Sequence, residues 1–233
     1  MEIFNYSSKD IIELSFQSGC MSEASITNSD LNTITSKHIV WNKSSIRDSN
    51  CNDAVFSHSR IKDCEFSRSS FINTQFYDCQ MSDDKMQGLS LIKAKFADSR
   101  LKNIIFDSCT MQRAEFTNTI IENSSIKDIE GIYAKVSNTL FINCYFEISY
   151  GIGMNGFSSA SFENCLFYSC QFSGYPLRGA NSTGCTFINC SGEITDDIET
   201  KNCCGLPQYP AEESMELKQL KEATDLIKEV SNV

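Results

Sequence analysis

Residues 94–116 read AKFADSRLKNIIFDSCTMQRAEF, and every fifth residue from Phe96 onwards is apolar. Extended over residues 16–146, the same step of five meets an apolar residue at 25 of 27 positions. It resumes at Phe157 after a slip of one residue, and it includes 15 of the 16 phenylalanines in a chain of 233 residues. The sequence is therefore organised as a tandem repeat of five residues.

The residue two places before each apolar position is also restricted. It is Gly, Ala, Ser, Thr or Cys at 20 of the 27 sites. Among the larger exceptions, Asp84 stands out, because a carboxylate at an inward site needs a partner or a local bulge. The exceptions are Leu14, Ile34, Ile39, Asp84, Leu89, Ile104 and Ile129.

A period of five excludes both common secondary structures as the whole explanation. Five helical residues overshoot one turn by roughly 140°, so the apolar set would spread around the helix. In a straight strand, residues five apart point to opposite faces. The chain must therefore turn a corner once per repeat and coil, with one large and one small side chain of each repeat facing inward.

This pattern resembles the pentapeptide-repeat family, whose unit is a small residue, a polar residue, a central Leu or Phe and two variable residues. Ala94 with Phe96 and Ala114 with Phe116 are examples. The resemblance implies an all-β solenoid, a right-handed quadrilateral β-helix of about twenty residues per coil. On that spacing we expect one aromatic stack, made of Phe56, Phe76, Phe96 and Phe116 and continued by Val136 and Phe157.

We divide the chain into a short N-terminal cap at 1–15, the β-helix at 16–192, a linker at 193–209 and a C-terminal amphipathic α-helix at 210–233. Ser7 or Ser8 is expected to begin a short helix in the cap. The C-terminal helix has an apolar stripe that includes Leu217, Leu220 and Ile227. Two roles for this stripe remain open: it seals the last coil, or it docks on a second copy, giving a homodimer, or on a further domain.

The chemistry-bearing residues are better explained by structure than by catalysis. Eight of the twelve cysteines occupy the small inward site, so we expect packed free thiols and no metal, and we expect Cys203 and Cys204 to be accessible. The glycine-rich residues 151–156 coincide with the slip and predict a loop, since the helix that a dinucleotide site needs is missing. His38 and His58, twenty residues apart, are expected to stack on one outer face. We therefore predict no enzyme activity, no catalytic residues and no cofactor.

The net charge is −10, but residues 193–233 hold ten acids and four lysines, so residues 1–192 are nearly balanced. A basic footprint for direct nucleic-acid binding is absent. No apolar run approaches a membrane span, and the N-terminus lacks the pattern of a secretory signal. We expect a cytoplasmic protein, in the bacterial cytosol or, for a secreted effector, in the host cytosol.

The function that remains is protein binding by the outer faces and loops of a rigid rod. We expect contacts at the irregular segments 128–133, 149–156 and 174–179, with Tyr175, Pro176, Met154 and Asn155 as candidate contact residues.

The resemblance implies two kinds of partner: host proteins recognised by the β-helix of a ubiquitin-ligase-type bacterial effector, or gyrase bound by a DNA-mimicking, dimeric topoisomerase-protecting protein. A structural spacer is the third alternative, and the irregular segments argue against it.

Overall fold

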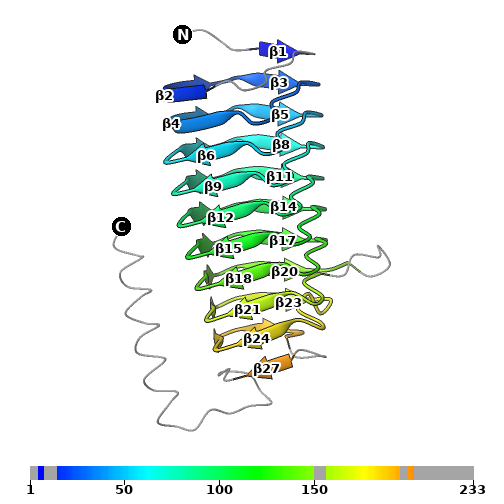
Figure 1. Ribbon diagram of the computed structural model, residues 1–233. Helices are drawn as coiled ribbons and strands as arrows, with labels where there is room; N and C mark the ends of the chain where they lie inside the picture. The colour runs from blue at the N-terminus through cyan, green and yellow to red at the C-terminus, as the bar shows by residue number, and fades with distance from the viewer. Residues whose placement is uncertain (1–4, 8–14, 150–155, 195–198, 202–233) are drawn as a thin grey trace.

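The computed structural model describes residues 5–7, 15–149, 156–194 and 199–201. Within them the chain forms 27 short parallel strands stacked in successive coils, and no helix (Figure 1). The fold is the expected all-β solenoid. The expected C-terminal helix at 210–233 lies outside the described residues.

The strands line three sides of the coil. The first side and the second side belong to one 17-stranded sheet, in which the long strands β2 (Ser15–Ser22) and β4 (Thr35–Asn42) cover both sides. The first side continues through β6 (Val55–Ser57), β9 (Gln75–Tyr77), β12 (Lys95–Ala97), β15 (Glu115–Thr117), β18 (Lys135–Ser137), β21 (Ser161–Glu163), β24 (Asn181–Thr183) and β27 (Glu199–Lys201). The second side continues through β7 (Arg60–Lys62), β10 (Gln80–Ser82), β13 (Arg100–Lys102), β16 (Ile120–Glu122), β19 (Leu140–Ile142), β22 (Leu166–Tyr168) and β25 (Thr186–Ile188).

A separate ten-stranded sheet forms the third side. Its strands are β1 (Asn5–Ser7), β3 (Ser25–Thr27), β5 (Ser45–Arg47), β8 (Glu65–Ser67), β11 (Lys85–Gln87), β14 (Ile105–Asp107), β17 (Ser125–Lys127), β20 (Tyr145–Glu147), β23 (Gln171–Ser173) and β26 (Ser191–Gly192). The fourth side is built from turns, which are linked from coil to coil by single bridges such as Asp30 to Asn50 and Glu130 to Gly156. Nine intervals of about 4.8 Å along the third side make the rod roughly 43 Å long.

The register repeats every twenty residues through the first seven coils. Phe96 pairs with Phe76 on one side and with Phe116 on the other, and the stacked rings lie 4.8 Å apart between centroids. The inward residues form one continuous core along the rod. The coil thus buries the two restricted positions of nearly every repeat, as the sequence predicts, whereas at the N-terminal end Phe16 is half-buried and Gly19 is exposed.

The corner of each repeat uses a left-handed backbone. In nearly every repeat the residue two places after the central residue has a positive φ, about +50° in most cases. More than half of the non-glycine residues with positive φ are Asn or Asp, as at Asn28 and Asp48, because these residues tolerate this region better than other side chains. Asn and Asp therefore mark the corners.

The glycine-rich slip adds six residues to one coil. Phe146 pairs with Phe172 and Val136 with Phe162, each 26 residues further on, and the twenty-residue spacing then returns. The expectation that Phe157 continues the stack above Val136 is therefore wrong. Phe157 lies instead over Gly131 on the fourth side, where a Cβ on Gly131 would come within 2.7 Å of the ring.

The strand ladder reaches into both ranges that we assigned to the ends. β1 lies within 1–15 and pairs with β3, and β27 lies within 193–209 and pairs with β24. Ser7, one of two residues expected to begin a short N-terminal helix, ends β1 and pairs with Thr27. The remainder of that expected cap helix lies outside the described residues.

The two non-apolar central residues of the stretch 16–146 and Asp84 fit the core in different ways. Ser36 is buried and accepts a hydrogen bond of 3.0 Å from Nε1 of Trp41. Gly131 leaves room for Phe157. Asp84 is buried in a regular repeat without a bulge, and its Oδ1 accepts a hydrogen bond of 2.7 Å from the backbone N–H of Cys64. Its Oδ2 is buried and has no partner among the described residues.

Candidate functional site

Two of the four predicted contact residues lie in the described part of the chain. Tyr175 is half-buried, and its carbonyl accepts a hydrogen bond of 3.0 Å from the backbone N–H of Arg178. Pro176 is buried, and its carbonyl accepts one of 2.8 Å from Phe157. They belong to a fourth-side turn stacked on the coil below, whereas Met154 and Asn155 lie outside the described residues, as do Leu217, Leu220 and Ile227.

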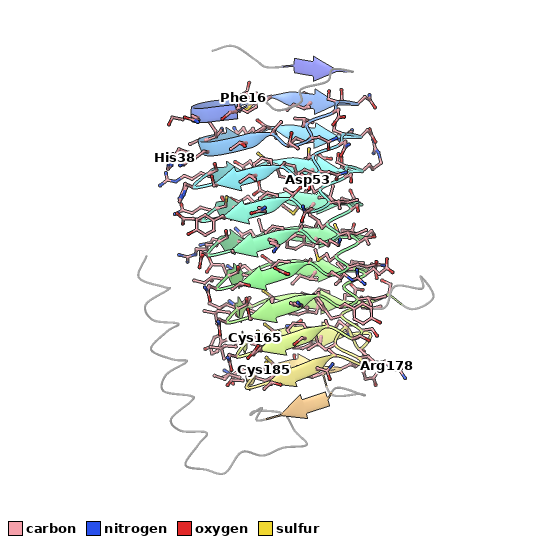
Figure 2. The ribbon with its side chains drawn as sticks, in the orientation of Figure 1. Phe16, His38, Asp53, Cys165, Arg178 and Cys185 are labelled. Atoms are coloured by element: carbon pink, nitrogen blue, oxygen red, sulfur yellow. The ribbon has the colours of Figure 1, made fainter. Side chains whose placement is uncertain are left out.

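The histidines and cysteines lie where the repeat predicts. The rings of His38 and His58 stack with centroids 5.0 Å apart, and Nδ1 of His58 lies 2.7 Å from Oδ2 of Asp78. The ten cysteines of the described residues are free thiols. Cys165 and Cys185 occupy the same position in successive coils (Figure 2). Within the described part of the chain, no three His, Cys, Asp or Glu side chains gather in a group that could hold a metal ion.

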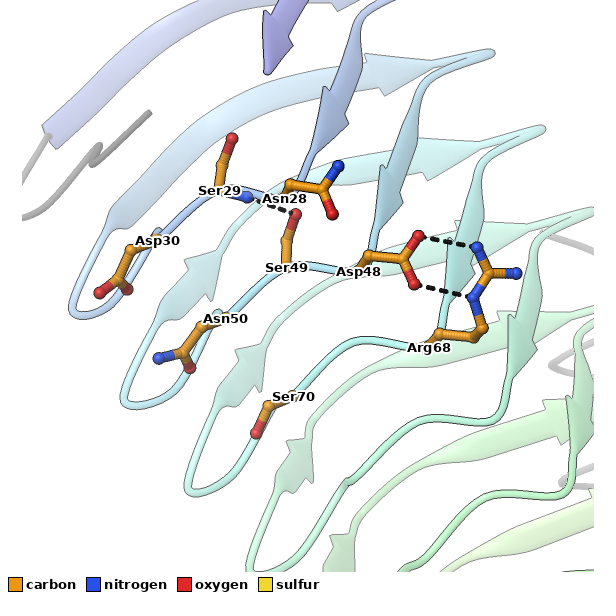
Figure 3. A pocket seen from close by; sticks show the side chains of 8 residues that line it. All are labelled: Asn28, Ser29, Asp30, Asp48, Ser49, Asn50, Arg68 and Ser70. Carbon is orange, nitrogen blue, oxygen red and sulfur yellow. Dashed lines mark hydrogen bonds and ion pairs between the residues drawn. The ribbon is translucent and has the colours of Figure 1, made fainter. Parts of the chain in front are cut away.

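A polar hollow of about 630 Å³ lies at the corner between the third and fourth sides, near the N-terminal end (Figure 3). Both carboxylate oxygens of Asp48 accept hydrogen bonds of 2.7 Å from Arg68. These bonds lower the pKa of the Asp48 carboxyl. The backbone N–H of Ser29 donates to Oγ of Ser49, 3.2 Å away. Asp48 is thus paired with Arg68, and Ser29 is bonded to Ser49, which leaves Asp30 as the carboxylate of the hollow without an ion pair to a described residue.

A groove of about 390 Å³ runs along the corner between the fourth and first sides, and most of its charged residues are cations. We call it the Tyr133 groove. Its lining residues come from two columns of the repeat: one is the left-handed corner position of the fourth side, and the other is the first residue of the first-side strands. They are Asn73, Lys93, Lys95, Arg113, Glu115, Tyr133 and Lys135.

The Tyr133 groove is cationic in a chain of net charge −10. Nζ of Lys95 lies 3.1 Å from Oε2 of Glu115, so one cation is paired within the groove. Lys93, Arg113 and Lys135 make no ion pair with any residue that the structure describes. Three positive side chains are thus available to a negatively charged ligand.

Tyr133 supplies the aromatic surface of the groove. Its side chain is 58% exposed, more than any other large hydrophobic residue in the described part of the chain. Its backbone φ of +59° holds it at the corner of the coil. One residue before the corner column lie half-buried Ile72, Ile92 and Ile132, with Gln112 between the last two. The corner therefore combines cations, one aromatic ring and apolar surface.

The sequence holds a signal for this groove. Positions 93, 113 and 133 are twenty residues apart, and they carry Lys, Arg and Tyr in a slot where Asn or Asp is the commonest choice. Aligning the outward positions at intervals of twenty residues would have revealed the groove. Residue types in single repeats do not show it, because the column forms only when successive coils stack.

Residues 59–135 match a family model described as a pentapeptide repeat region. The chain carries a pentapeptide-repeat region. This region contains every residue that lines the Tyr133 groove. No curated protein matches the chain.

Several solved structures resemble this chain. HetL from Nostoc sp. strain PCC 7120, described as involved in heterocyst differentiation regulation, is 11% identical over 84% of this chain and 88% of its own, with a TM-score of 0.46. A trypsin-treated form of QnrB1, a plasmid-mediated fluoroquinolone resistance protein, is 13% identical over 83% and 92%, with a TM-score of 0.45. Rfr23 from Cyanothece 51142 is 7% identical over 77% and 89%, with a TM-score of 0.27. Likenesses at these scores carry no argument about function.

The described residues in the core enclose little space for a small molecule. The void among Phe106, Met111, Phe116 and Phe157 amounts to about 10 Å³, no more than a single water molecule needs. None of the described residues form a helix long and apolar enough to cross a membrane. What the described residues present to other molecules is the outer surface of the coils.

Proposed function

We propose that this pentapeptide-repeat protein is a non-enzymatic protein-binding module whose Tyr133 groove holds an acidic segment of its partner. The carrying observation is the group of three cations without ion pairs beside a 58% exposed tyrosine. Aromatic and arginine side chains dominate the energy of protein interfaces, and the groove contains both. The rigid coil fixes them in place before binding, which reduces the entropy lost on association.

The shape of the groove favours an extended segment. Lys93, Arg113 and Tyr133 lie in successive coils, so adjacent members of the column are about 4.8 Å apart. A peptide crossing the coils can therefore meet a cation, a second cation and the ring in order. Its acidic residues would face the cations, and its apolar residues would pack against Tyr133, Ile92 and Ile132.

The sign of the groove argues against imitation of duplex DNA. A protein that occupies a DNA-binding surface must present negative charge, because such surfaces are built to neutralise phosphates. The cationic Tyr133 groove would instead repel a cationic DNA-binding surface. We therefore place the gyrase-binding alternative second, and we expect no effect on gyrase supercoiling at a concentration near 1 µM. We retain as a separate prediction that a partner contacts Tyr175, Pro176, Met154 and Asn155.

The test compares the proteins captured by three baits, from a bacterial and from a host-cell lysate. The first bait is the native chain. The second is the groove variant, Lys93→Glu, Arg113→Glu and Tyr133→Ala. The third is a control with the same change in charge, Lys43→Glu, Lys62→Glu and Tyr145→Ala, which changes exposed residues on other sides.

We expect quantitative mass spectrometry to find partners that the native chain and the control retain and the groove variant loses. Their binding should weaken as salt is raised, because the cations are exposed and their attraction is screened within about 8 Å at physiological ionic strength. Capture of the same partners by the groove variant and the native chain would contradict the proposal. All three baits should have the same circular dichroism spectrum.

A further inference from the structure

An apolar cluster lies on the outer surface of the second side, at the C-terminal half of the rod. Leu140, Ile142 and Leu166 occupy positions that flank a central residue and therefore point away from the core. Ile120, Tyr168 and Ile188 pack against them. We call these six residues the Leu140 patch. It is separate from the main core and spans four successive coils.

The aliphatic residues of the patch are much more buried than the exposed outward aliphatic residues elsewhere on the rod. Outward aliphatic residues elsewhere on the rod are 38% exposed at Val40 and 42% exposed at Ile105. By contrast, Leu140 is 4% exposed, and Ile142 and Leu166 are each 9% exposed. Neighbours in the same column cover the flanks of these side chains, but burial this deep of large side chains also needs atoms over their outward ends. The patch is therefore a surface with a cover.

The polar margin of the patch supports the same conclusion. Glu122 is in an outward slot, one coil before Ile142, and it is 8% exposed. Its carboxylate oxygens each accept a hydrogen bond of 3.2 Å from Arg100, and Nζ of Lys102 lies 3.5 Å from Oε1. A buried carboxylate needs such partners. The two cations also give the N-terminal edge of the patch an excess of positive charge.

We propose that residues 211–230 of the same chain form an amphipathic helix that lies lengthwise on the Leu140 patch. The segment holds six acids and three lysines, so its charge complements the cationic edge at Arg100 and Lys102. Its apolar residues at 217, 220 and 227 recur at helical spacing. In this arrangement the helix neither seals the last coil nor docks on a second copy of the chain.

The dimensions of the two surfaces agree. From Leu217 to Ile227 a helix rises about 15 Å, at 1.5 Å per residue. The patch extends over three intervals between coils, about 14 Å at 4.8 Å each. The chain also leaves the rod in the right place. β27 ends at Lys201 on the first side, the second side follows it in each coil, and the row of Ile188 is the neighbouring one.

The residues between Lys201 and the proposed helix suffice for the connection. Nine residues, 202–210, span up to about 30 Å when extended, at roughly 3.3 Å each. The connection must cross only one corner of the coil and reach the nearest row of the patch. The chain can therefore place Leu217 over the last rows of the patch without leaving its own rod.

The experiment is photocrosslinking in the full-length chain, with p-benzoylphenylalanine replacing Ile142 in one protein and Ile105 in another. Equal amounts of light and ¹⁵N-labelled chain are mixed before irradiation, so that crosslinks within one chain differ in mass from those between copies. We expect the probe at 142 to react with a peptide from 211–230 of its own chain. We expect the probe at 105, an exposed outward position on the third side, not to react with that peptide.

Leu217→Asp with Leu220→Asp should abolish the crosslink from position 142. A pair that leaves the apolar stripe intact, Lys218→Asp with Lys221→Asp, should retain it. Mixed-isotope crosslinks would assign the patch to a second copy and overturn the proposal. Crosslinks from 142 only to other segments, or none to 211–230, would overturn it as well. Circular dichroism of each variant checks that the rod is folded, because the substitutions lie outside its core.

Discussion

The indole Nε1 of Trp41 donates a hydrogen bond of 3.0 Å to Oγ of Ser36 within the buried core of the rod. Ser36 is a central residue of its repeat, where 25 of 27 positions are apolar. The hydroxyl supplies the one acceptor that a buried indole needs. The hydrogen bond from Trp41 therefore explains why Ser36 stands at a position that is otherwise apolar.

Ser36→Ala should destabilise the rod by about 1–3 kcal/mol, because it leaves the buried N–H of Trp41 without an acceptor. Denaturant unfolding followed by circular dichroism measures the loss, because this signal is available with and without the tryptophan. In a Trp41→Phe background the same serine substitution should cost much less, since the donor is gone. Equal costs in the two backgrounds would show that the hydrogen bond contributes nothing.

Gly131→Ala should also destabilise the rod, because the added Cβ would lie 2.7 Å from Cδ1 of Phe157 and 3.1 Å from Cδ1 of Ile129. Overpacking of this kind costs about 1–3 kcal/mol. Gly19→Ala is the control, since its Cβ would meet only Cδ1 of Ile39, at 3.9 Å. The melting temperature should fall for Gly131→Ala alone. A similar fall for both variants would contradict the placement of Phe157.

Asp84 should make the stability of the rod depend on pH. Burial raises the pKa of its carboxyl from 3.8 to about 7 in the folded chain. The folded state then binds a proton that the unfolded state has released, so stability falls as pH rises from about 4 to about 7 and is constant above that. The loss between pH 5 and pH 8 should be about 2–3 kcal/mol.

Asp84→Ser is the matched control for this titration. Serine at this inward site accepts the backbone N–H of the preceding coil elsewhere in the rod, as Ser44 does from Ala24. The variant should be more stable than the native chain at pH 8 and should lose most of the pH dependence in denaturant unfolding. An unchanged slope between pH 5 and pH 8 would mean that Asp84 does not titrate in this range.

The thiols should differ sharply in reactivity towards an alkylating reagent at pH 8. Cys20 is exposed and should react rapidly in the folded chain. Burial raises the pKa of Cys79 to about 11 and that of Cys64 and Cys109 to about 12, so these thiols should react only after unfolding. Mass spectrometry of peptides after timed alkylation measures each rate, with Cys20→Ser as the control. Rapid labelling of Cys64 would show that the coil opens locally.

Much of the fold was predictable from the sequence alone, because each repeat of five residues meets the same local constraint. The step from Phe56 to Phe76 to Phe96 requires a coil of four corners, and the small residue before each centre requires an inward face. The stacking of His38 on His58 follows from the same period. Such features depend only on spacing within regular coils, so the pattern of residue types determines them.

The tertiary structure decided two kinds of feature: those at which the spacing changes, and those formed by residues of different coils. The slip near residue 150 leaves two alignments for Phe157, and the close fit to Gly131 decides between them through packing. The cations of the Tyr133 groove and the outward residues of the Leu140 patch belong to different repeats, and only stacking brings them together. The sequence by itself determined the coil, because its constraints are local. The two surfaces were decided by the tertiary structure, because charge and burial at a surface depend on neighbours twenty or more residues away.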